Sequence, residues 1–336
     1  MTLPVKTLHT LDYFLNAKIN NLMNSHLSAK RSTLYALIGP TCTFKTKISI
    51  DLAEKNNFEI ISADSRLVYK EMDIGTSKPT VEERKNIPHY MIDLIFPNED
   101  YSVALYKREA EKNIENIFKK GKIPLFVGGT GLYLNSVLSG LSIPEVKPDK
   151  ELRNELKTVS QNELYKRLCE MDPEAAKKIH ENDKFRTIRA IEIISTTGEL
   201  FSVQQKKKDL PFDVVWIGLT YKDRNLHKEK IQKRTEIFLA NGFVDEVKIL
   251  LDKYGELDLF KNTIGYSEAL DFLNNKINKD EMIEKITLST KQLAKRQMTW
   301  FRANKEIKWV YLDDFNPMYD FLDIESFPKI SMLSKS

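Results

Sequence analysis

The ten residues from Leu37 to Thr46, LIGPTCTFKT, constrain the fold of this chain more than any other stretch. A short apolar run at 34–38 leads into Gly39, and Lys45 and Thr46 follow six residues later. This is the spacing of a phosphate-binding loop, G-x-x-x-x-G-K-[ST], which joins a strand to a helix. Backbone N–H groups of such a loop surround phosphate oxygens, while the lysine neutralises their charge and the hydroxyl binds Mg²⁺. The pattern therefore predicts an anion site at a helix N-terminus.

Phe44 departs from the pattern because it stands where the second glycine is expected. Glycine is favoured there since it has no Cβ and adopts positive φ without strain. For a bulky L-residue, the left-handed conformation costs about 1–2 kcal/mol, and the ring must also point away from the phosphate. The loop pattern alone therefore leaves open a functional site, a defective one and a chance match.

Alternating strand and helix patterns continue after this loop, which predicts an α/β fold with a parallel sheet flanked by helices. Strands are expected at 34–38, 58–64, 123–129 and 212–220, and helices at 46–56, about 102–119 and 132–141. Residues 143–197 are charged and helical, with a break at MDPEAA. Because a strand follows them, a helical insertion is more economical than two domains in series. We therefore expect an extension at 1–33, a core at 34–142 and 211–318, and an insertion at 143–210.

Composition narrows the class of protein without naming its partner. A length of 336 residues suggests about two domains, and 52 Lys and Arg against 48 Asp and Glu leave a net charge of only +4. Cys42 and Cys169 are far apart, which argues against a disulfide framework or a cysteine-based zinc site and favours a reducing compartment. No apolar run approaches the roughly 18 residues of a membrane span, so no membrane contact is expected. We expect a cytoplasmic protein, with a transit peptide in 1–33 as the alternative.

Two further groups of polar residues follow predicted strands. Asp64 and Ser65 end the strand FEIISAD, and Thr130 follows the strand IPLFVGG. Carboxyl ends of parallel strands meet at one edge of a sheet, so these residues and the phosphate loop are expected to converge. Each also has a plain structural interpretation. Asp64 would cap the next turn, and the glycines around Thr130 would form a tight strand-to-helix connection.

Ordered blocks along the chain resemble the motifs of the tRNA dimethylallyltransferase (isopentenyltransferase) family, bacterial type. The blocks are GPTCTFKT, EIISADSRLVYKEMDIGTSKPT, IPHYMID, YSVALY, GKIPLFVGGTGLYL, NDKFRTIRAIEI, ANGFVDEVKILL, NTIGYSEAL and KQLAKRQMTWFR, and together they span about 34–312. The resemblance implies a P-loop nucleotide-kinase-like core with a helical insertion. It also implies a monomer that transfers a dimethylallyl group, with Mg²⁺, from dimethylallyl diphosphate to tRNA. The acceptor is the exocyclic amine of the adenine 3′ of the anticodon, in tRNAs reading codons that begin with U.

The resemblance also assigns roles to individual positions. Asp64 matches the general base, Thr130 a contact at the reaction centre, Lys45 a diphosphate and catalytic position, and Thr46 the Mg²⁺ position. The diphosphate site comprises Gly39, Pro40, Thr41, Cys42, Thr43, Phe44, Lys45, Thr46, Lys230 and Arg234. The segments that contact the tRNA anticodon stem-loop include Asp64, Ser65, Arg66, Leu67, Arg153, Phe185, Arg186, Arg189, Gly265, Tyr266, Lys295, Arg296, Gln297, Trp300 and Arg302.

The assigned chemistry is physically sensible for these residue types. An allylic diphosphate needs its leaving charge neutralised, and an aromatic amine needs an acceptor for its proton. The target adenine must also leave the stacked anticodon loop. In KRQMTWFR we expect Lys295, Arg296 and Arg302 to contact RNA phosphates, and the aromatic pair Trp300 and Phe301 to pack in the core rather than stack on bases.

Three departures cluster on the expected diphosphate site. Phe44 replaces the loop glycine, and Lys230 and Lys291 replace arginines, which lose two-pronged phosphate geometry when they become lysine. The hypothesis is that diphosphate binding is weakened or rearranged. The alternatives to an active tRNA enzyme are a divergent paralogue with little transfer activity, an adenylate (AMP) isopentenyltransferase, and a small-molecule P-loop kinase. The zinc finger of eukaryotic relatives is absent, since only two cysteines occur.

Overall fold

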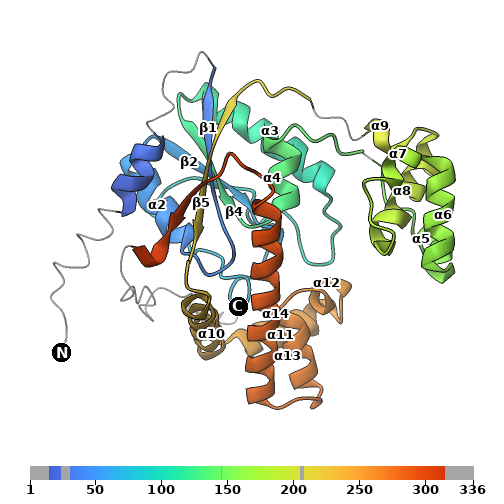
Figure 1. Ribbon diagram of the computed structural model, residues 1–336. Helices are drawn as coiled ribbons and strands as arrows, with labels where there is room; N and C mark the ends of the chain where they lie inside the picture. The colour runs from blue at the N-terminus through green and yellow to red at the C-terminus, as the bar shows by residue number, and fades with distance from the viewer. Residues whose placement is uncertain (1–14, 24–30, 145, 205–207, 315–336) are drawn as a thin grey trace. The chain divides into compact units, whose positions relative to one another are not determined.

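The computed structural model describes residues 15–23, 31–144, 146–204 and 208–314. Within this part of the chain, six parallel strands form one sheet in the order β3-β2-β4-β1-β5-β6 (Figure 1). The strands are β1 Thr33–Ile38, β2 Phe58–Ala63, β3 His89–Tyr90, β4 Ile123–Gly128, β5 Asp213–Thr220 and β6 Lys308–Tyr311. The α/β fold predicted from the sequence is confirmed, and all four strands expected around the phosphate loop are present.

The central strands consist almost wholly of buried residues, as a parallel sheet covered on both faces requires. In β1 every residue after Thr33 is buried, and in β2 every residue is buried. Because side chains on both faces of these strands are covered, mostly apolar residues follow one another instead of alternating with polar ones. The two residues of β3 are too few to produce any pattern, and this strand was not expected.

The helices fall into two compact units. The first unit contains the sheet and comprises the described residues of Met1–Tyr101, Arg108–Leu134 and Pro211–Ser336. The second comprises those of Ser102–Lys107 and Asn135–Leu210. Three helices alternate with the first four strands. They are α2 Lys45–Lys55 after β1, α3 Val103–Lys119 between β3 and β4, and α4 Gly131–Leu138 after β4. The predicted division at 142/143 and 210/211 stays a prediction, and residues 135–142 group with the helical unit.

The second unit is a small helical assembly with its own core. Its helices are α5 Lys150–Thr158, α6 Gln161–Met171, α7 Pro173–Ala176, α8 Lys184–Thr197 and α9 Phe201–Gln204. Side chains of Asp149, Ser160, Asp172 and Asp183 each accept a backbone N–H at a helix start, which is how these polar residues set the boundaries. Leu156, Leu164, Leu168, Ile191 and Ile193 are buried between the helices.

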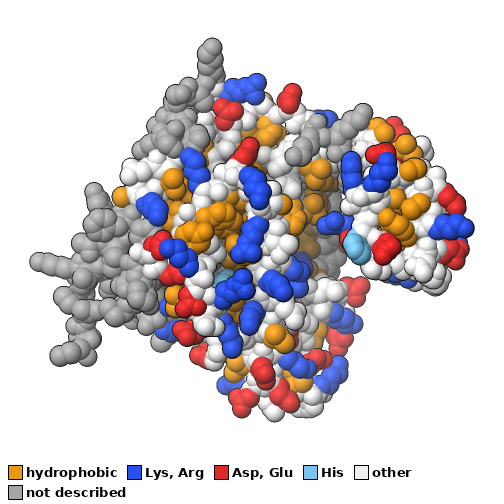
Figure 2. Space-filling model, viewed as in Figure 1, with side chains coloured by type: hydrophobic (Ala, Val, Ile, Leu, Met, Phe, Trp, Pro, Cys, Tyr) orange, Lys and Arg blue, Asp and Glu red, His pale blue; other side chains and the backbone are white. Residues whose placement is uncertain are grey.

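The helices after β5 are α10 Arg224–Ala240, α11 Phe243–Tyr254, α12 Asp258–Lys261, α13 Tyr266–Leu273 and α14 Lys279–Phe301. The long α14 begins with a capping box at Asn278 and Glu281 and ends in Phe301, which is buried. On the face of the first unit where α10 and α14 lie, Lys and Arg side chains gather (Figure 2). This face contrasts with the weak net charge of the whole chain.

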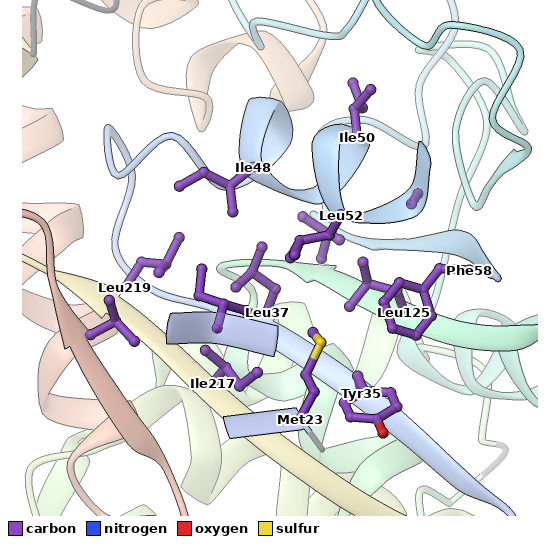
Figure 3. Packing of buried hydrophobic residues seen from close by; sticks show 14 of the residues in the cluster. Met23, Tyr35, Leu37, Ile48, Ile50, Leu52, Phe58, Leu125, Ile217 and Leu219 are labelled. Atoms are coloured by element: carbon purple, nitrogen blue, oxygen red, sulfur yellow. The ribbon is translucent and has the colours of Figure 1, made fainter. Parts of the chain in front are cut away.

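The main core lies between α2 and the sheet. Ile48 and Leu52 of α2 pack against Leu37 of β1 and Ile217 of β5 (Figure 3). Residues 15–23 are helical, and Leu15, Ile19 and Met23, spaced four residues apart, are buried in the same cluster. Part of the predicted extension at 1–33 is therefore core, while 1–14 and 24–30 lie outside the described residues.

Candidate active site

Three strands of the sheet end at the same level. Ile38 of β1 and Ala63 of β2 both pair with Gly128 of β4. The residues that follow these strands therefore share one edge of the sheet. They begin the phosphate-loop sequence, the Asp64 segment and the Gly-Thr turn, and the predicted convergence is confirmed.

The loop from Gly39 to Lys45 folds back on itself at the end of β1. Gly39 has φ +154°, and a Cβ there would lie 2.3 Å from the Leu219 carbonyl oxygen of β5, so only glycine fits. The Lys45 Nζ donates to the Pro40 carbonyl oxygen at 2.7 Å. The Thr43 hydroxyl donates to the same oxygen at 2.9 Å. Thr46, in the first turn of α2, is exposed.

Phe44 adopts the conformation of the glycine that it replaces. Its φ of 54° and ψ of 22° are left-handed, and it stands immediately before the first residue of α2. The half-buried ring packs against the cluster between α2 and the sheet, so it is directed into the core. The left-handed backbone expected from the sequence is therefore present, and the ring packs against the core. Weakened diphosphate binding stays a prediction.

Lys45 has an unusual titration. Burial, together with a smaller effect of the Arg234 charge, lowers the pKa of Lys45 to about 8. Cys42 and Asp64 act in the opposite direction and raise the pKa of Lys45. The mutual influence shows that the loop lysine, the carboxylate after β2 and the α10 arginine share one electrostatic environment.

Thr130 holds the backbone on both sides of Asp64. Its N–H donates to the Ala63 carbonyl oxygen, and its hydroxyl oxygen accepts the Ser65 N–H, each at 3.0 Å. Asp64 Oδ1 accepts the Arg66 N–H at 2.8 Å, so the interpretation of Asp64 as a cap of the next turn is confirmed. The carboxylate is half-buried and fixed in direction, which is compatible with a role as a proton acceptor.

The loop is also held from outside at Thr41. Its N–H donates to Gln297 Oε1 at 2.9 Å, its carbonyl oxygen accepts from His227 Nε2 at 2.9 Å, and its hydroxyl accepts from Arg234 at 2.6 Å. Burial lowers the pKa of His227, the hydrogen bond to Thr41 opposes this, and Lys45 adds to the lowering. Sequence reasoning missed His227 entirely, because no pattern marks a contact 186 residues away.

Comparison with known proteins identifies the family. The family model described as IPP transferase matches residues 67–304, and one described as isopentenyl transferase matches 32–94. The tRNA dimethylallyltransferase of Caldanaerobacter subterraneus is 43% identical over 291 residues, covering 83% of this chain and 91% of that protein. The tRNA dimethylallyltransferase of Gloeothece citriformis is 45% identical over 279 residues, with the same two coverages.

The chain belongs to the tRNA dimethylallyltransferase family. Solved structures agree with this. A tRNA isopentenylpyrophosphate transferase from Bacillus halodurans has a TM-score of 0.62 and 36% identity, covering 85% of this chain and 93% of that one. A eukaryotic dimethylallyltransferase acting on tRNA has a TM-score of 0.72 and 30% identity, covering 83% and 74%.

The family's basic block on α14 divides into two faces. Lys295, Arg296 and Arg302 are exposed, as expected for RNA contacts. Gln297 and Trp300 instead face the Gly-Thr turn. A Cβ on Gly129 would lie 2.3 Å from Gln297 Nε2, and one on Gly131 would lie 2.4 Å from the Trp300 ring. The two glycines therefore admit α14, and the predicted packing of Phe301 in the core is confirmed.

The family segment at 262–267 is mostly buried. Tyr266 has no exposed surface, and its hydroxyl donates to Glu246 Oε1 at 2.6 Å. Burial raises the pKa of Glu246, and four donors lower it: Tyr266 and the N–H groups of 73–75. The side chain of Tyr266 is thus unavailable to RNA in this conformation, and Gly265 is also buried. Exposed Asn262 accepts from Arg66 through its carbonyl oxygen.

In the helical unit, the predicted tRNA residues also differ in exposure. Phe185 is 76% exposed, and Arg186 is exposed beside it at the start of α8. Arg153 makes a two-pronged ion pair with buried Glu192, at 2.7 and 2.8 Å, and Arg189 binds the same carboxylate. These hydrogen bonds lower the pKa of Glu192 against the effect of its burial. Arg153 and Arg189 therefore already have a structural task.

Two further features bear on ligands of a dimethylallyltransferase. Lys230 is buried on α10, one turn before Arg234. Among the residues that the structure describes, no three His, Cys, Asp or Glu side chains are grouped as metal ligands.

None of the described helices is long and apolar enough to cross a membrane.

Proposed function

We propose that this chain transfers a dimethylallyl group from dimethylallyl diphosphate to the exocyclic amine of the adenine 3′ of the anticodon in tRNA. The observation that supports this most is the single sheet edge shared by Lys45, Asp64 and Thr130. Lys45 suits a departing anion, and Asp64 suits the proton of an attacking amine. A kinase can use an aspartate in the same way, to accept the proton of an attacking hydroxyl. The choice of a dimethylallyl donor over a phosphoryl donor therefore rests on the family to which the chain belongs.

The leaving-group half of the site would consist of the loop and α10. Lys45 and the N–H groups around it would bind the diphosphate, with Arg234 beside Thr41 adding positive charge. Lys45 Nζ, now bonded to Pro40, would exchange this carbonyl for a phosphate oxygen. The diphosphate would in turn favour the charged form of Lys45 and raise its pKa.

Mg²⁺ fits this donor set. The exposed Thr46 hydroxyl at the start of α2 is a hard oxygen ligand, and such sites take most of their remaining ligands from substrate phosphates and water. A protein-only cage is therefore not required. When bound, Mg²⁺ would neutralise charge on the leaving diphosphate.

The acceptor half would be built on Asp64. The adenine amine nitrogen would attack the first carbon of the dimethylallyl group while the carbon–oxygen bond to diphosphate breaks. The amine proton would pass to the Asp64 carboxylate, so charge and atoms balance. Thr130 would keep this carboxylate in place through its two backbone bonds. Its hydroxyl oxygen accepts from Ser65 and can still donate its own proton to substrate.

We further propose that tRNA contacts are carried by exposed residues: Lys295 and Arg296 of α14, Arg302 directly after it, and Phe185 and Arg186 of α8. Arginine and lysine would bind phosphates, and an exposed phenylalanine can stack on an unpaired base. The unpaired cysteines Cys42 and Cys169 fit a reducing compartment, and a cytoplasmic monomer is the simplest proposal.

Labelled dimethylallyl diphosphate, offered with Mg²⁺ and either unmodified tRNA or AMP, tests this proposal. We expect label in tRNA and none in AMP. Asp64→Asn should abolish transfer while diphosphate binding persists, because asparagine is nearly the same size but accepts no proton at neutral pH. Label in AMP alone would identify an adenylate enzyme. In a separate incubation with ATP, transfer of its phosphoryl group to a small molecule would identify a kinase.

A further inference from the structure

Gln297 uses both ends of its side-chain amide to join two parts of the site. Its Oε1 accepts the Thr41 N–H of the phosphate loop at 2.9 Å. Its Nε2 donates to the Gly129 carbonyl oxygen, next to Thr130, at 3.1 Å. Gln297 lies 256 residues from Thr41 and 168 residues from Gly129 in sequence, so this one side chain directly ties two distant segments together.

The amide has little freedom to move. Any side chain at position 129 would meet Nε2, so the glycine leaves a space that the amide fills. The helix that carries Gln297 is anchored on either side, because Ala294 and Phe301 are buried and the Trp300 ring lies against Gly131. A donor and an acceptor are both needed here, and the primary amide of glutamine supplies both without a charge.

The loop needs such external support more than a glycine-containing loop would. Both Cys42, with φ 63°, and Phe44, with φ 54°, hold left-handed conformations. For L-residues each such conformation costs about 1–2 kcal/mol and persists only where surrounding contacts impose it. Thr41 stands directly before this strained stretch, and its N–H, carbonyl and hydroxyl are all held from α10 and α14.

We propose that Gln297 is a positioning residue that keeps the diphosphate loop in register with the Thr130 turn, rather than a residue that contacts tRNA. This inference rests on the proposed function for its effect on turnover. Loss of the amide would loosen the loop, which weakens diphosphate binding. It would also separate the leaving-group half of the site from the Asp64 half, which slows transfer.

The test compares Gln297→Met, which keeps length and loses both hydrogen bonds, with Gln292→Met, an exposed glutamine on the same helix. Binding of inorganic diphosphate is measured by calorimetry without tRNA, and steady-state transfer is measured with tRNA. Two lost hydrogen bonds predict roughly 10- to 100-fold lower kcat/KM for dimethylallyl diphosphate. Diphosphate affinity should also fall about tenfold, and the KM for tRNA should stay within about twofold. Gln292→Met should match wild type.

Two results would overturn the inference. A raised KM for tRNA with unchanged diphosphate affinity would make Gln297 an RNA contact. A lowered melting temperature with unchanged affinity of the folded protein would make it structural only. An inactive wild type that still binds diphosphate, with weaker binding in Gln297→Met, would count against the proposed function and leave this inference standing.

A second pair of variants covers the case in which Gln297→Met does not fold. Gly129→Ala should push the amide aside and reproduce the loss of diphosphate affinity. In Gln297→Ala with Gly129→Ala, the added methyl no longer meets the amide, and its next neighbour is the Gly39 carbonyl oxygen at 3.3 Å, which needs to yield by only a few tenths of an ångström. The double variant should therefore be little worse than Gln297→Ala alone. Additive losses in the double variant would show that the two residues act independently, which contradicts the tie.

Discussion

Replacing Phe44 by glycine or by alanine separates its two effects on stability, which are the strain of its left-handed backbone and the burial of its ring. The left-handed backbone costs about 1–2 kcal/mol for any L-residue. The half-buried ring recovers about 0.8–1.5 kcal/mol, taking half of the 1.5–3 kcal/mol for a fully buried phenylalanine. Phe44→Gly removes both contributions and adds backbone entropy to the unfolded chain of about 0.5–1 kcal/mol. Its free energy of unfolding should therefore lie between about 1.5 kcal/mol below and about 0.7 kcal/mol above that of wild type.

Phe44→Ala keeps the strain and loses the ring, so it should be less stable than wild type by about 0.8–1.5 kcal/mol, and also less stable than Phe44→Gly. Since Phe44 already has the glycine conformation, its loop should bind dimethylallyl diphosphate as well as the glycine variant, with KM values within about threefold. Urea unfolding and steady-state transfer measure the two quantities.

A gain of tenfold or more in diphosphate affinity on Phe44→Gly would refute this reasoning. It would instead support the hypothesis, drawn from sequence, that Phe44 impairs the loop. Equal stability of the alanine and glycine variants would also count against the account, because it would mean that residue 44 is not strained in solution.

Three more measurements follow from single contacts. The pKa of Lys45 is about 8 in the free protein and should rise beside the bound anion, so binding of dimethylallyl diphosphate at pH 9 should take up a proton. The affinity for dimethylallyl diphosphate should therefore fall above pH 8, by up to about tenfold per pH unit. Calorimetry in two buffers measures this uptake, and Lys45→Arg should abolish it. Tyr266→Phe removes a donor from Glu246 and should lower the free energy of unfolding by about 2 kcal/mol. Because this hydrogen bond lowers the pKa of Glu246, the loss should grow as the pH rises, and a loss that shrinks as the pH rises would contradict the assignment. Arg296→Ala should weaken tRNA binding for all sequences and lessen its salt dependence by about one counterion, and an unchanged slope would exclude a phosphate contact.

The order of elements was predictable because each depends on local sequence. Continuous apolar runs marked the buried parallel strands, and the polar residues after them lay at the expected edge. Even the left-handed backbone at Phe44 followed from its place in the loop. The short strand β3 and the helix at 15–23 were not predicted, since two residues give no period and the burial of Leu15 depends on a distant partner.

In the candidate site, only residues that belong to a local motif could be predicted. Lys45 and Asp64 belong to segments whose position is set by the strand before them. The hydrogen bonds to Thr41 could not be predicted in this way, because His227 and Gln297 lie 186 and 256 residues away in the sequence. Likewise, burial of Tyr266 and pairing of Arg153 with Glu192 depend on tertiary packing, which no spacing in the chain reveals.

Mass spectrometry of tRNA nucleosides tests the central claim most directly. The chain, or its Asp64→Asn variant, would be expressed in cells that lack their own tRNA dimethylallyltransferase, and the anticodon loops would be sequenced. The account predicts isopentenyladenosine at the adenine 3′ of the anticodon with the wild-type chain and unmodified adenine with the variant. An unmodified adenine in both, or equal modification by Asp64→Asn, would contradict it.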